Sequence, residues 1–361
     1  MSIINKEILD SLLVAVQDES LNKFEIYCSF LSGSKTEGLA TPKSDYDIYI
    51  VVNILPEGIN HNELFLPYKD GLIEVTLLRK SYILDGFKRL IDNNADLISQ
   101  ISLYEALLYH RILIGIPIVN KINYCSLKEK VPINELKFFL SHYSFNFSRK
   151  CFNDCIGNIE ANDLDTAIYN ADRAVHSAID VLIVNHGSTS NSVKWRSRYI
   201  KKFLGLDHPM FIRYKELTSS LPLMVSSPEK LRYIERVGYF IHVVNEFYCM
   251  KQVFKNINYE FSEERIWGVS PINLNMNKRI VKKGLIKVDY NKNKIIISDF
   301  YKYYTLSKEA FAVWYSINNE NSKNDIINEV ARILEKEYDE CYSIVEESLR
   351  FFYSNGFLYD Y

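Results

Sequence analysis

The first 120 residues alternate between helical and strand-like patterns. Apolar residues recur at helical spacing in Lys6–Val16 and Leu97–Ile114, and the second run ends at Gly115-Ile116-Pro117. Between these runs, three segments rich in β-branched and aromatic residues predict strands: Phe24–Leu31, Asp45–Val52 and Leu72–Leu78. We therefore expect residues 1–120 to form an α+β domain built on a mixed sheet with helices.

From Ile133 to about Glu260 the pattern is almost wholly helical. Apolar residues recur at helical spacing in Leu136–Phe152, Leu164–Asn185, Ser192–Leu204 and Leu231–Phe254. We expect a helical bundle domain over residues 121–262.

The chain changes character again after Phe261. Two β-rich runs, Arg279–Tyr290 and Lys294–Phe300, flank the polar residues Asn291-Lys292-Asn293, which predicts a hairpin. Three helical patterns follow, at Ser307–Ile317, Ser322–Glu337 and Cys341–Ser354. Residues 263–361 therefore predict a small winged-helix-like module of three strands and three helices.

Length and composition are consistent with a three-domain globular protein. The chain has 361 residues, of which 47% are apolar and 24% charged, and no apolar run is long enough to span a bilayer. The N-terminal residues lack the basic and apolar segments of a signal peptide. We expect a cytoplasmic protein that does not associate with membranes. The net charge of −2 argues against a nucleic-acid partner, which usually requires a basic surface.

Six cysteines are spread along the chain, and only Cys151 and Cys155 are close in sequence. Their spacing fits one face of a helix, without the second pair or histidines of a zinc site. We expect reduced thiols that pack in the helical core.

Candidate chemistry begins with two acids in the strand-like run Asp45–Val52. Alternate side chains of a strand point to opposite faces, so Asp45 and Asp47 project on the same side, about 6–7 Å apart. Tyr46, Ile48 and Ile50 then point into a core. Two carboxylates placed in this way can share a divalent ion or hold two.

Two further features surround these acids. Upstream, the run Phe24–Leu31 leads into Ser32-Gly33-Ser34, where glycine permits close backbone approach and serine offers a hydroxyl and an amide to a phosphate. Downstream, Glu74 stands in the apolar run Leu72–Leu78, where a carboxylate is costly unless it meets a cation or hydrogen-bond donors. Glu74 is the natural third metal ligand or a general base.

Gly33-Ser34, Asp45-Tyr46-Asp47-Ile48 and Glu74 together resemble the signature of the DNA polymerase β-type nucleotidyltransferase superfamily. Ser32 departs from it, because the family usually has an apolar residue at this position, one that only packs. Ser44 and the segment Tyr109–Pro117 are similar to small-molecule and antibiotic-modifying members.

The resemblance implies transfer of a nucleotide from a nucleoside triphosphate, with release of pyrophosphate. It implies two Mg²⁺ ions, one bridged by Asp45 and Asp47 and one held by the aspartates and Glu74. Gly33 and Ser34 would cradle the phosphates, and Lys35 or Lys43 would neutralise charge there, unless these lysines are simply exposed loop residues. ATP is favoured as the donor only because members of this superfamily commonly use it.

The helical segment Ala171–Leu204 resembles the domain that closes the cleft in small-molecule members of this superfamily, and Lys194 would then reach a phosphate. Lys194, Arg198 and Lys201 predict one positive stripe on a helix, either a solvated face or a substrate-binding rim. His142 and His176 lie on apolar helical faces and are expected to be structural.

Residues 279–361 resemble the peptide-recognition element of ribosomally made, modified peptide pathways, the fold of the pyrroloquinoline-quinone peptide chaperone. That resemblance implies a leader peptide pairing along the strand edge Tyr301–Leu306. The contacts implied are Tyr303 and Thr305 on the strand and Ile344, Ser348, Phe351 and Phe352 on the last helix. A winged-helix module for nucleic acid is the plain alternative, although the acidic last helix fits it poorly.

These expectations combine into one hypothesis: a magnesium-dependent nucleotidyltransferase that acts on a precursor peptide held by its C-terminal module. Three alternatives stay open. An Asp-x-Asp pair also occurs in turns and in some glycosyltransferases, the acceptor can be a small molecule such as an antibiotic, and the chain can be a non-catalytic scaffold that binds nucleotide or peptide.

Overall fold

A computed structural model describes residues 14, 24–41, 43–56, 59–68, 71–92, 101–219, 221–254, 280–282, 287–291, 294–298, 302–317 and 321–360. The predicted helix Lys6–Val16, apart from Val14, and the beginning of Leu97–Ile114 lie outside the described residues. The chain divides into two compact units, Met1–Leu140 with Gly187–Arg198, and Ser141–His186 with Tyr199–Tyr361. A short segment from the middle of the chain, Gly187–Arg198, therefore belongs to the first unit.

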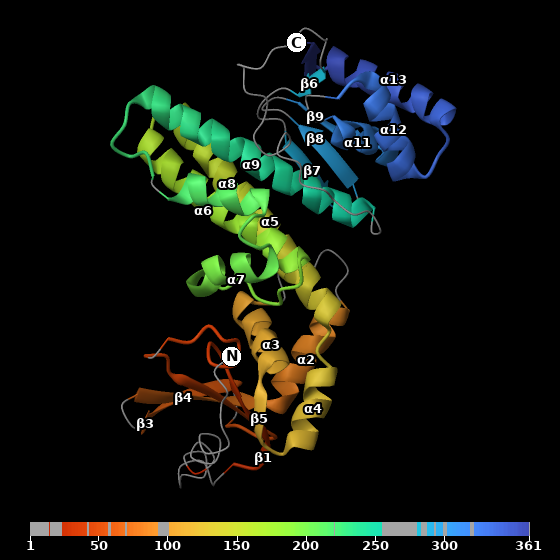
Figure 1. Cartoon of the computed structure of the whole chain (residues 1–361). Coiled ribbons are helices and arrows are strands. Elements are labelled where there is room, and N and C mark those ends of the chain that lie inside the picture. The colour runs from red at the N-terminus through yellow and green to blue at the C-terminus, as the bar shows by residue number, and fades with distance from the viewer. Residues whose placement is uncertain are drawn as a thin grey trace. The chain divides into compact units, whose positions relative to one another are not determined.

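A five-stranded mixed sheet forms the centre of the first unit (Figure 1), with the strand order β3-β4-β2-β1-β5. Its strands are β1 (Ile26–Ser32), β2 (Tyr46–Val52), β3 (His61–Tyr68), β4 (Gly71–Arg79) and β5 (Ile116–Val119). The pair β2–β4 is parallel, and the other three pairs are antiparallel.

Alternation along the strands gives this sheet two chemically different faces. One face carries a buried aliphatic cluster whose members come from β1, β2, β4 and the turn after β2: Leu31, Ile48, Ile50, Val52, Leu55, Ile73, Val75 and Leu77. The side chains between them, including Asp47, Tyr49 and Glu74, point to the opposite face. Ile48 and Ile50 are therefore core residues, as the alternation predicts.

Helices α2 (Lys80–Ile91), α3 (Leu103–Ile114) and α4 (Lys121–Glu129) complete the described part of this unit. The helix α3 begins at a capping box, in which the Ser102 hydroxyl accepts from the Glu105 amide and the Glu105 carboxylate accepts from the Ser102 amide at 2.9 Å. Tyr124 of α4 donates to the carbonyls of Ile112 and Gly115 at 2.8 and 2.6 Å, and its ring lies against Phe30 of β1. These contacts hold α3 and α4 against β1.

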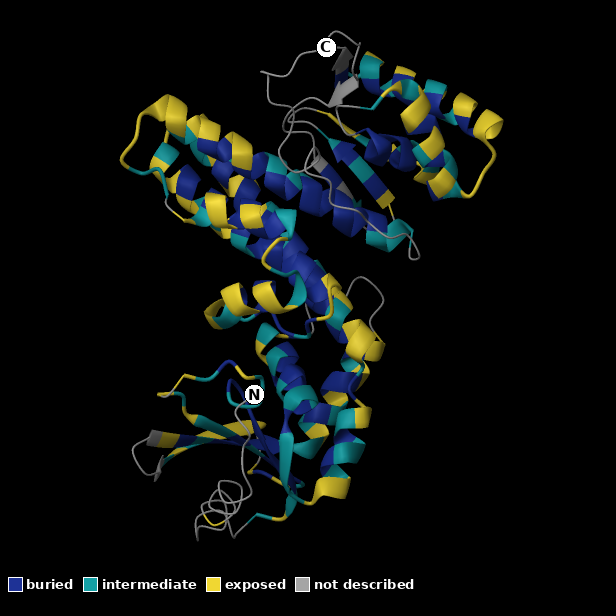
Figure 2. Cartoon of the chain, in the orientation of Figure 1, coloured by how far each residue is buried: buried dark blue, intermediate teal, exposed yellow. Residues whose placement is uncertain are grey.

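The second unit contains a helical bundle. Its helices are α5 (Ile133–Glu160), which begins in the first unit, α6 (Leu164–Asn185), α7 (Arg196–Phe203), α8 (Pro209–Thr218) and α9 (Ser227–Val253). The helix α6 packs on α8 and α9, and Figure 2 shows buried inner faces and exposed outer faces on these helices. The short 3-10 helix η2 (Val193–Trp195) precedes α7.

The C-terminal module belongs to the same unit as the bundle. The strands β7 (Lys287–Asn291), β8 (Lys294–Ser298) and β9 (Tyr303–Leu306) form an antiparallel sheet, and β6 (Ile280–Lys282) pairs with β10 (Leu358–Asp360). The helices are α11 (Lys308–Ser316), α12 (Lys323–Leu334) and α13 (Tyr338–Ser354). The module packs on α9 through β7, and the rings of Phe254 and Phe311 stack at 6.5 Å.

Most element predictions agree with the structure within a few residues. The α+β character, the bundle helices and the hairpin are confirmed, and β3, β5, α2, α4 and α8 were not predicted. The run Arg279–Tyr290 contains two strands, β6 and β7, rather than one. All six cysteines are free thiols, and Cys151 and Cys155 are buried as expected. Among the described helices, none is long and apolar enough to cross a membrane.

Candidate functional site

The turn after β1 holds the carboxylate of Asp47. Gly33 has a φ of +87°, a left-handed conformation, and a Cβ added there would lie 1.7 Å from Asp47 Oδ2. The turn is closed by the Gly33 carbonyl, which accepts from the Thr36 amide at 3.1 Å and from the Thr36 hydroxyl at 2.9 Å. Only glycine allows the carboxylate to lie directly against the backbone here.

The sheet places Glu74 beside Asp47. In the parallel pair β2–β4, Asp47 is the direct partner of Glu74, and on its other side Asp47 is the partner of Ser32. Asp45 precedes β2 by one residue and is exposed. The three predicted acids therefore lie at the same end of two adjacent strands.

The three acids lie close enough for their charges to act on one another. Burial raises the pKa of Asp47, and the charge of Asp45 raises it further, whereas Arg111, Lys194 and Lys35 lower it. Burial also raises the pKa of Glu74, to which the charges of Asp47, Glu63 and Asp45 add, and Arg111 opposes them. The acids thus concentrate negative charge, which the positive charges of Arg111, Lys194 and Lys35 partly balance.

The donor set of the acids suits a hard divalent cation, since Mg²⁺ prefers carboxylate oxygens and like-charged carboxylates gain most from sharing a cation. In the part of the chain that the structure describes, no three His, Cys, Asp or Glu side chains converge as a ready-made metal site. Asp47 and Glu74 are therefore adjacent ligand candidates, and Asp45 would have to turn toward them.

Arg111 was not predicted as a site residue. It lies on α3 within the segment Tyr109–Pro117, which was noted for its resemblance to antibiotic-modifying enzymes, and it is half-buried. Among the positive charges that lower the pKa of Asp47, that of Arg111 has the largest effect. The sequence signal available was an arginine on a mostly apolar helix, because a buried guanidinium requires an anionic partner.

The predicted lysines have different surroundings. The Lys35 ammonium lies 4.1 Å from the centre of the Tyr46 ring, and the Lys194 ammonium lies 5.2 Å from the Trp195 ring. Both are close enough to Asp47 to lower its pKa. Lys43 is exposed in the loop before β2. Lys194 is distant in sequence, but the segment Gly187–Arg198 that carries it belongs to the same unit as the acids.

Two expectations about neighbouring residues need correction. Ser32 does more than pack: it is fully buried, and its hydroxyl donates to the Arg111 carbonyl at 2.8 Å, which ties the end of β1 to α3. Lys194, Arg198 and Lys201 do not form one helical stripe, because Lys194 lies in η2, and the Arg198 guanidinium donates to the Leu39 carbonyl. Ser34 of the predicted phosphate turn is largely buried, and its carbonyl accepts from the Leu39 amide at 2.8 Å.

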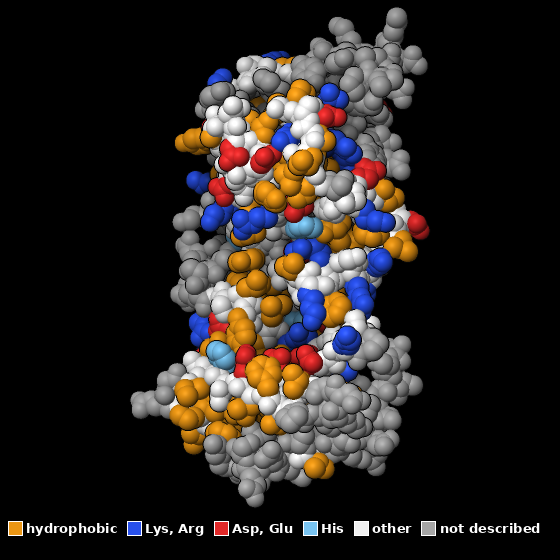
Figure 3. All heavy atoms as spheres, turned by 90° about the vertical axis from the view of Figure 1, so that its left-hand side faces the viewer, with side chains coloured by type: hydrophobic (Ala, Val, Ile, Leu, Met, Phe, Trp, Pro, Cys, Tyr) orange, Lys and Arg blue, Asp and Glu red, His pale blue; other side chains and the backbone are white. Residues whose placement is uncertain are grey.

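An exposed aromatic and acidic surface lies beside Glu74. Phe65 of β3 is the direct partner of Glu74 and is 62% exposed. Farther along β3, the His61 ring lies 5.1 Å from the Tyr104 ring. The charge of Glu63 contributes to the raised pKa of both Glu74 and Tyr104. Figure 3 shows acidic side chains in a row, bordered by hydrophobic side chains.

His142 and His176, which we expected to be structural, each contact a tyrosine hydroxyl of another bundle helix. His142 Nδ1 lies 2.6 Å from the Tyr248 hydroxyl, and burial lowers the pKa of this imidazole to about 4. His176 Nδ1 lies 2.8 Å from the Tyr214 hydroxyl.

In the C-terminal module, β9 is an edge strand of the described sheet, as predicted, and Tyr303 and Thr305 are exposed on it. Phe352 is wrong as a peptide contact, because it is fully buried with its ring 5.2 Å from Trp314. Ser348 is also buried. Ile344 and Phe351 are half-buried, and Phe351 packs against Tyr304 of β9 at 5.2 Å.

No protein-family model and no curated protein matches this sequence. Among solved structures, a nucleotidyltransferase-like protein from Exiguobacterium sibiricum is similar over 69% of this chain and 79% of its own, with a TM-score of 0.43 and 12% sequence identity. A similarity at this level adds nothing to the chemistry of the site, which depends on the residues described above.

Proposed function

We propose that this protein is a metal-dependent nucleotidyltransferase that transfers a nucleoside monophosphate, with ATP as the favoured donor, to an acceptor and releases pyrophosphate. The observation that carries the proposal is the contact between the Gly33 turn and the Asp47 carboxylate, with Glu74 in register on the adjacent strand. A glycine turn beside paired carboxylates suits a triphosphate chelated to a cation.

The reaction is an in-line displacement at the α-phosphorus. A bond forms between the acceptor oxygen and phosphorus as the bond to the bridging oxygen breaks, and pyrophosphate leaves. Glu74 is placed to take the acceptor's proton if it is not itself a ligand, because its raised pKa makes it a stronger base than an ordinary carboxylate. Arg111, Lys35 and Lys194 offset the negative charge of the phosphates.

Mg²⁺, held by Asp45, Asp47 and Glu74, would supply Lewis-acid stabilisation of the leaving group and acidify the acceptor hydroxyl. The protein's own contribution is to hold these oxygens at the end of two interior strands, next to the Gly33 turn, where little backbone rearrangement is needed.

The first test measures pyrophosphate release from ATP and the other nucleoside triphosphates with Mg²⁺. Asp47→Asn preserves the volume of the side chain and should abolish turnover, whereas Asp154→Asn on α5 in the second unit should leave it unchanged. Full activity in Asp47→Asn would contradict the proposal. Chelation with EDTA should remove activity, and added Mg²⁺ should restore it.

For the acceptor, we propose a ribosomally made precursor peptide whose leader pairs with the edge of β9 opposite β8. Support comes from the edge position of β9 and from the exposure of Tyr303, which is 79% exposed. Covalent linkage to the catalytic unit would raise the local concentration of a bound peptide to about the millimolar range.

A precursor peptide encoded beside the gene, labelled and titrated with the full chain, tests this acceptor. Tyr303→Ala should weaken binding several-fold, while Tyr169→Ala, on an exposed face of α6, should not. Point variants are preferable to deletion of residues 263–361, because the module packs on α9 and its removal would expose apolar surface.

A small-molecule acceptor is the second candidate, favoured by the surface of Phe65, Tyr104 and Glu63 beside Glu74. Phe65→Ala should then raise KM for such an acceptor without changing the affinity for nucleotide. If the full chain does not bind the precursor peptide, this candidate becomes the favoured one.

A further inference from the structure

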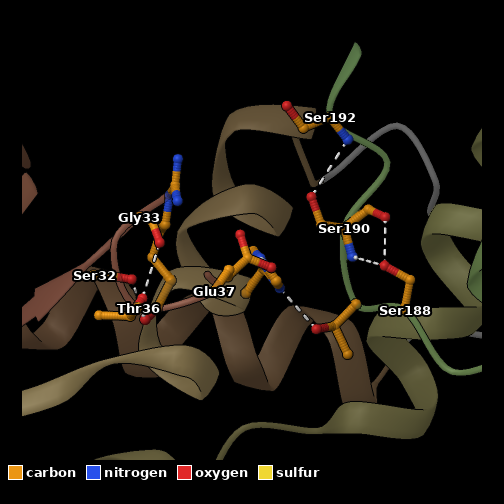
Figure 4. Close-up of polar contacts among 10 residues, drawn as sticks. Ser32, Gly33, Thr36, Glu37, Ser188, Ser190 and Ser192 are labelled. Atoms are coloured by element: carbon orange, nitrogen blue, oxygen red, sulfur yellow. Dashed lines mark hydrogen bonds and ion pairs between the residues drawn. The ribbon is translucent and has the colours of Figure 1, made fainter. Parts of the chain in front are cut away.

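A buried polar chain links the phosphate turn to the segment Gly187–Arg198. His110 of α3 lies between two partners, with Nε2 3.2 Å from Glu37 Oε1 and Nδ1 2.8 Å from Thr189 Oγ1. The side chains of His110 and Glu37 are only 5% and 3% exposed. Glu37 comes from the turn after Gly33, and in Figure 4 it points away from that turn, toward the segment that carries Ser188, Ser190 and Ser192.

Burial gives these two contacts their weight. The Glu37 carboxylate lies within ion-pair distance of His110 Nε2, and the Thr189 hydroxyl shares a hydrogen bond with Nδ1. Because water is largely excluded here, removing either partner would leave a polar atom of the imidazole without compensation.

The segment itself is shaped by hydroxyl contacts and fixed at a second point. The Ser188 hydroxyl donates to the Ser190 carbonyl at 2.7 Å and accepts from the Ser190 amide at 3.1 Å. Farther along, the Arg198 guanidinium donates to the Leu39 carbonyl. Glu37 and Leu39 both belong to the loop that begins at Gly33, so this loop is joined to the segment at two places.

Lys194 lies between the two attachment points, Thr189 and Arg198. It is an exposed lysine with its ammonium over the Trp195 ring, and its charge acts on Asp47. Because Lys194 lies on the short 3-10 helix between these two contacts, its position depends on how the segment is docked.

We propose that His110 is a positioning residue, which together with Glu37 and Thr189 docks the segment Gly187–Arg198 on the loop that follows Gly33 and thereby fixes the position of Lys194 in the first unit. The inference assigns the segment a specific role in nucleotide binding, and in that respect it rests on the proposed function. The docking itself does not depend on that function.

The first experiment compares variants that remove one contact each. Thr189→Val keeps the shape of the side chain and removes the hydroxyl, and Thr189→Ser restores it. We expect Thr189→Val to raise KM for the nucleoside triphosphate about fivefold with little change in kcat, since a lost hydrogen bond is worth roughly that factor. Thr189→Ser, which keeps the hydroxyl, should have a KM close to that of the wild type. The matched control is Thr218→Val on α8, whose hydroxyl donates within its own helix.

A double-mutant cycle then tests whether the effect passes through Lys194. If it does, Thr189→Val should have little further effect on KM in a Lys194→Ala background. Effects that multiply independently, or an unchanged KM in Thr189→Val, would overturn the assignment.

Amide hydrogen exchange on the full chain separates docking from nucleotide binding. In Thr189→Val, residues 187–198 and 33–39 should exchange faster than in the wild type, with α6 unaffected. If the wild type turns over no nucleotide but these segments still respond together, the proposed function fails and the docking stands. If exchange in the two segments is unchanged, the positioning role of His110 is refuted.

Discussion

The position most sensitive to a small change is Gly33. Its φ of +87° costs an L-residue about 1–2 kcal/mol, and an alanine Cβ would also lie 1.7 Å from Oδ2 and 2.7 Å from Cγ of Asp47. All three of the nearest atoms belong to Asp47, so this side chain must move. Leaving its rotamer adds about 0.5–1.5 kcal/mol. Gly33→Ala should therefore destabilise its unit by roughly 2–3 kcal/mol.

The loss of activity should exceed the loss of stability, because a displacement of about 1 Å in a catalytic group can cost on the order of 10²-fold in rate. Gly38→Ala is the matched control, since Gly38 has a φ of +72° with nothing within 4 Å of an added Cβ. It should show the backbone penalty of about 1–2 kcal/mol without the effect on Asp47.

The assay combines thermal unfolding with pyrophosphate release at a temperature where all variants are folded. A loss of about 1 kcal/mol lowers Tm by roughly 2–4 °C in a domain of this size class. Gly157→Ala within α5 has space for a Cβ and should be neutral or slightly stabilising. If Gly33→Ala retains the activity of Gly38→Ala, the close contact between the turn and Asp47 does not exist in solution.

Three further predictions follow from the same geometry. Because burial raises the pKa of Asp47, the ionised carboxylate destabilises the folded state, and Asp47→Asn should raise Tm at pH 7–8. This gain in Tm should vanish as the pH falls toward the ordinary aspartate pKa of about 4. A variant with the Tm of the wild type across this whole range would contradict the prediction. Arg111→Ala removes a positive charge that lowers the pKa of Asp47 and of Glu74. In a plot of turnover rate against pH, the fall in rate on the acidic side should therefore begin at a higher pH than in the wild type. If it begins at the same pH, Arg111 does not belong to the site. In the module, Phe352→Ala should cost about 3–5 kcal/mol on thermal or denaturant unfolding, and Phe351→Ala clearly less, because only Phe352 is fully buried.

The acids and the strands that carry them were predictable because their signal is local. The period of two in β2 places Ile48 and Ile50 on one face and Asp47 on the other, whatever the rest of the chain does. The hairpin β7–β8 and the helices of the module have the same kind of signal, in turn residues and helical spacing. Short or exposed elements such as β3 and β5 lack it and were missed.

The sequence by itself therefore determined which residues alternate in and out of the sheet, where the long helices run and which strand positions carry the acids. Tertiary structure alone decided that Glu74 lies opposite Asp47, because the parallel register of β2 and β4 depends on their crossover connection. It also decided that Phe352 is core, and that Arg111, His110 and Thr189 belong with the Gly33 turn. His110 and Thr189 are 79 positions apart in the sequence. Many loop closures between such distant segments are possible, and a local sequence pattern does not indicate which of them the folded chain adopts.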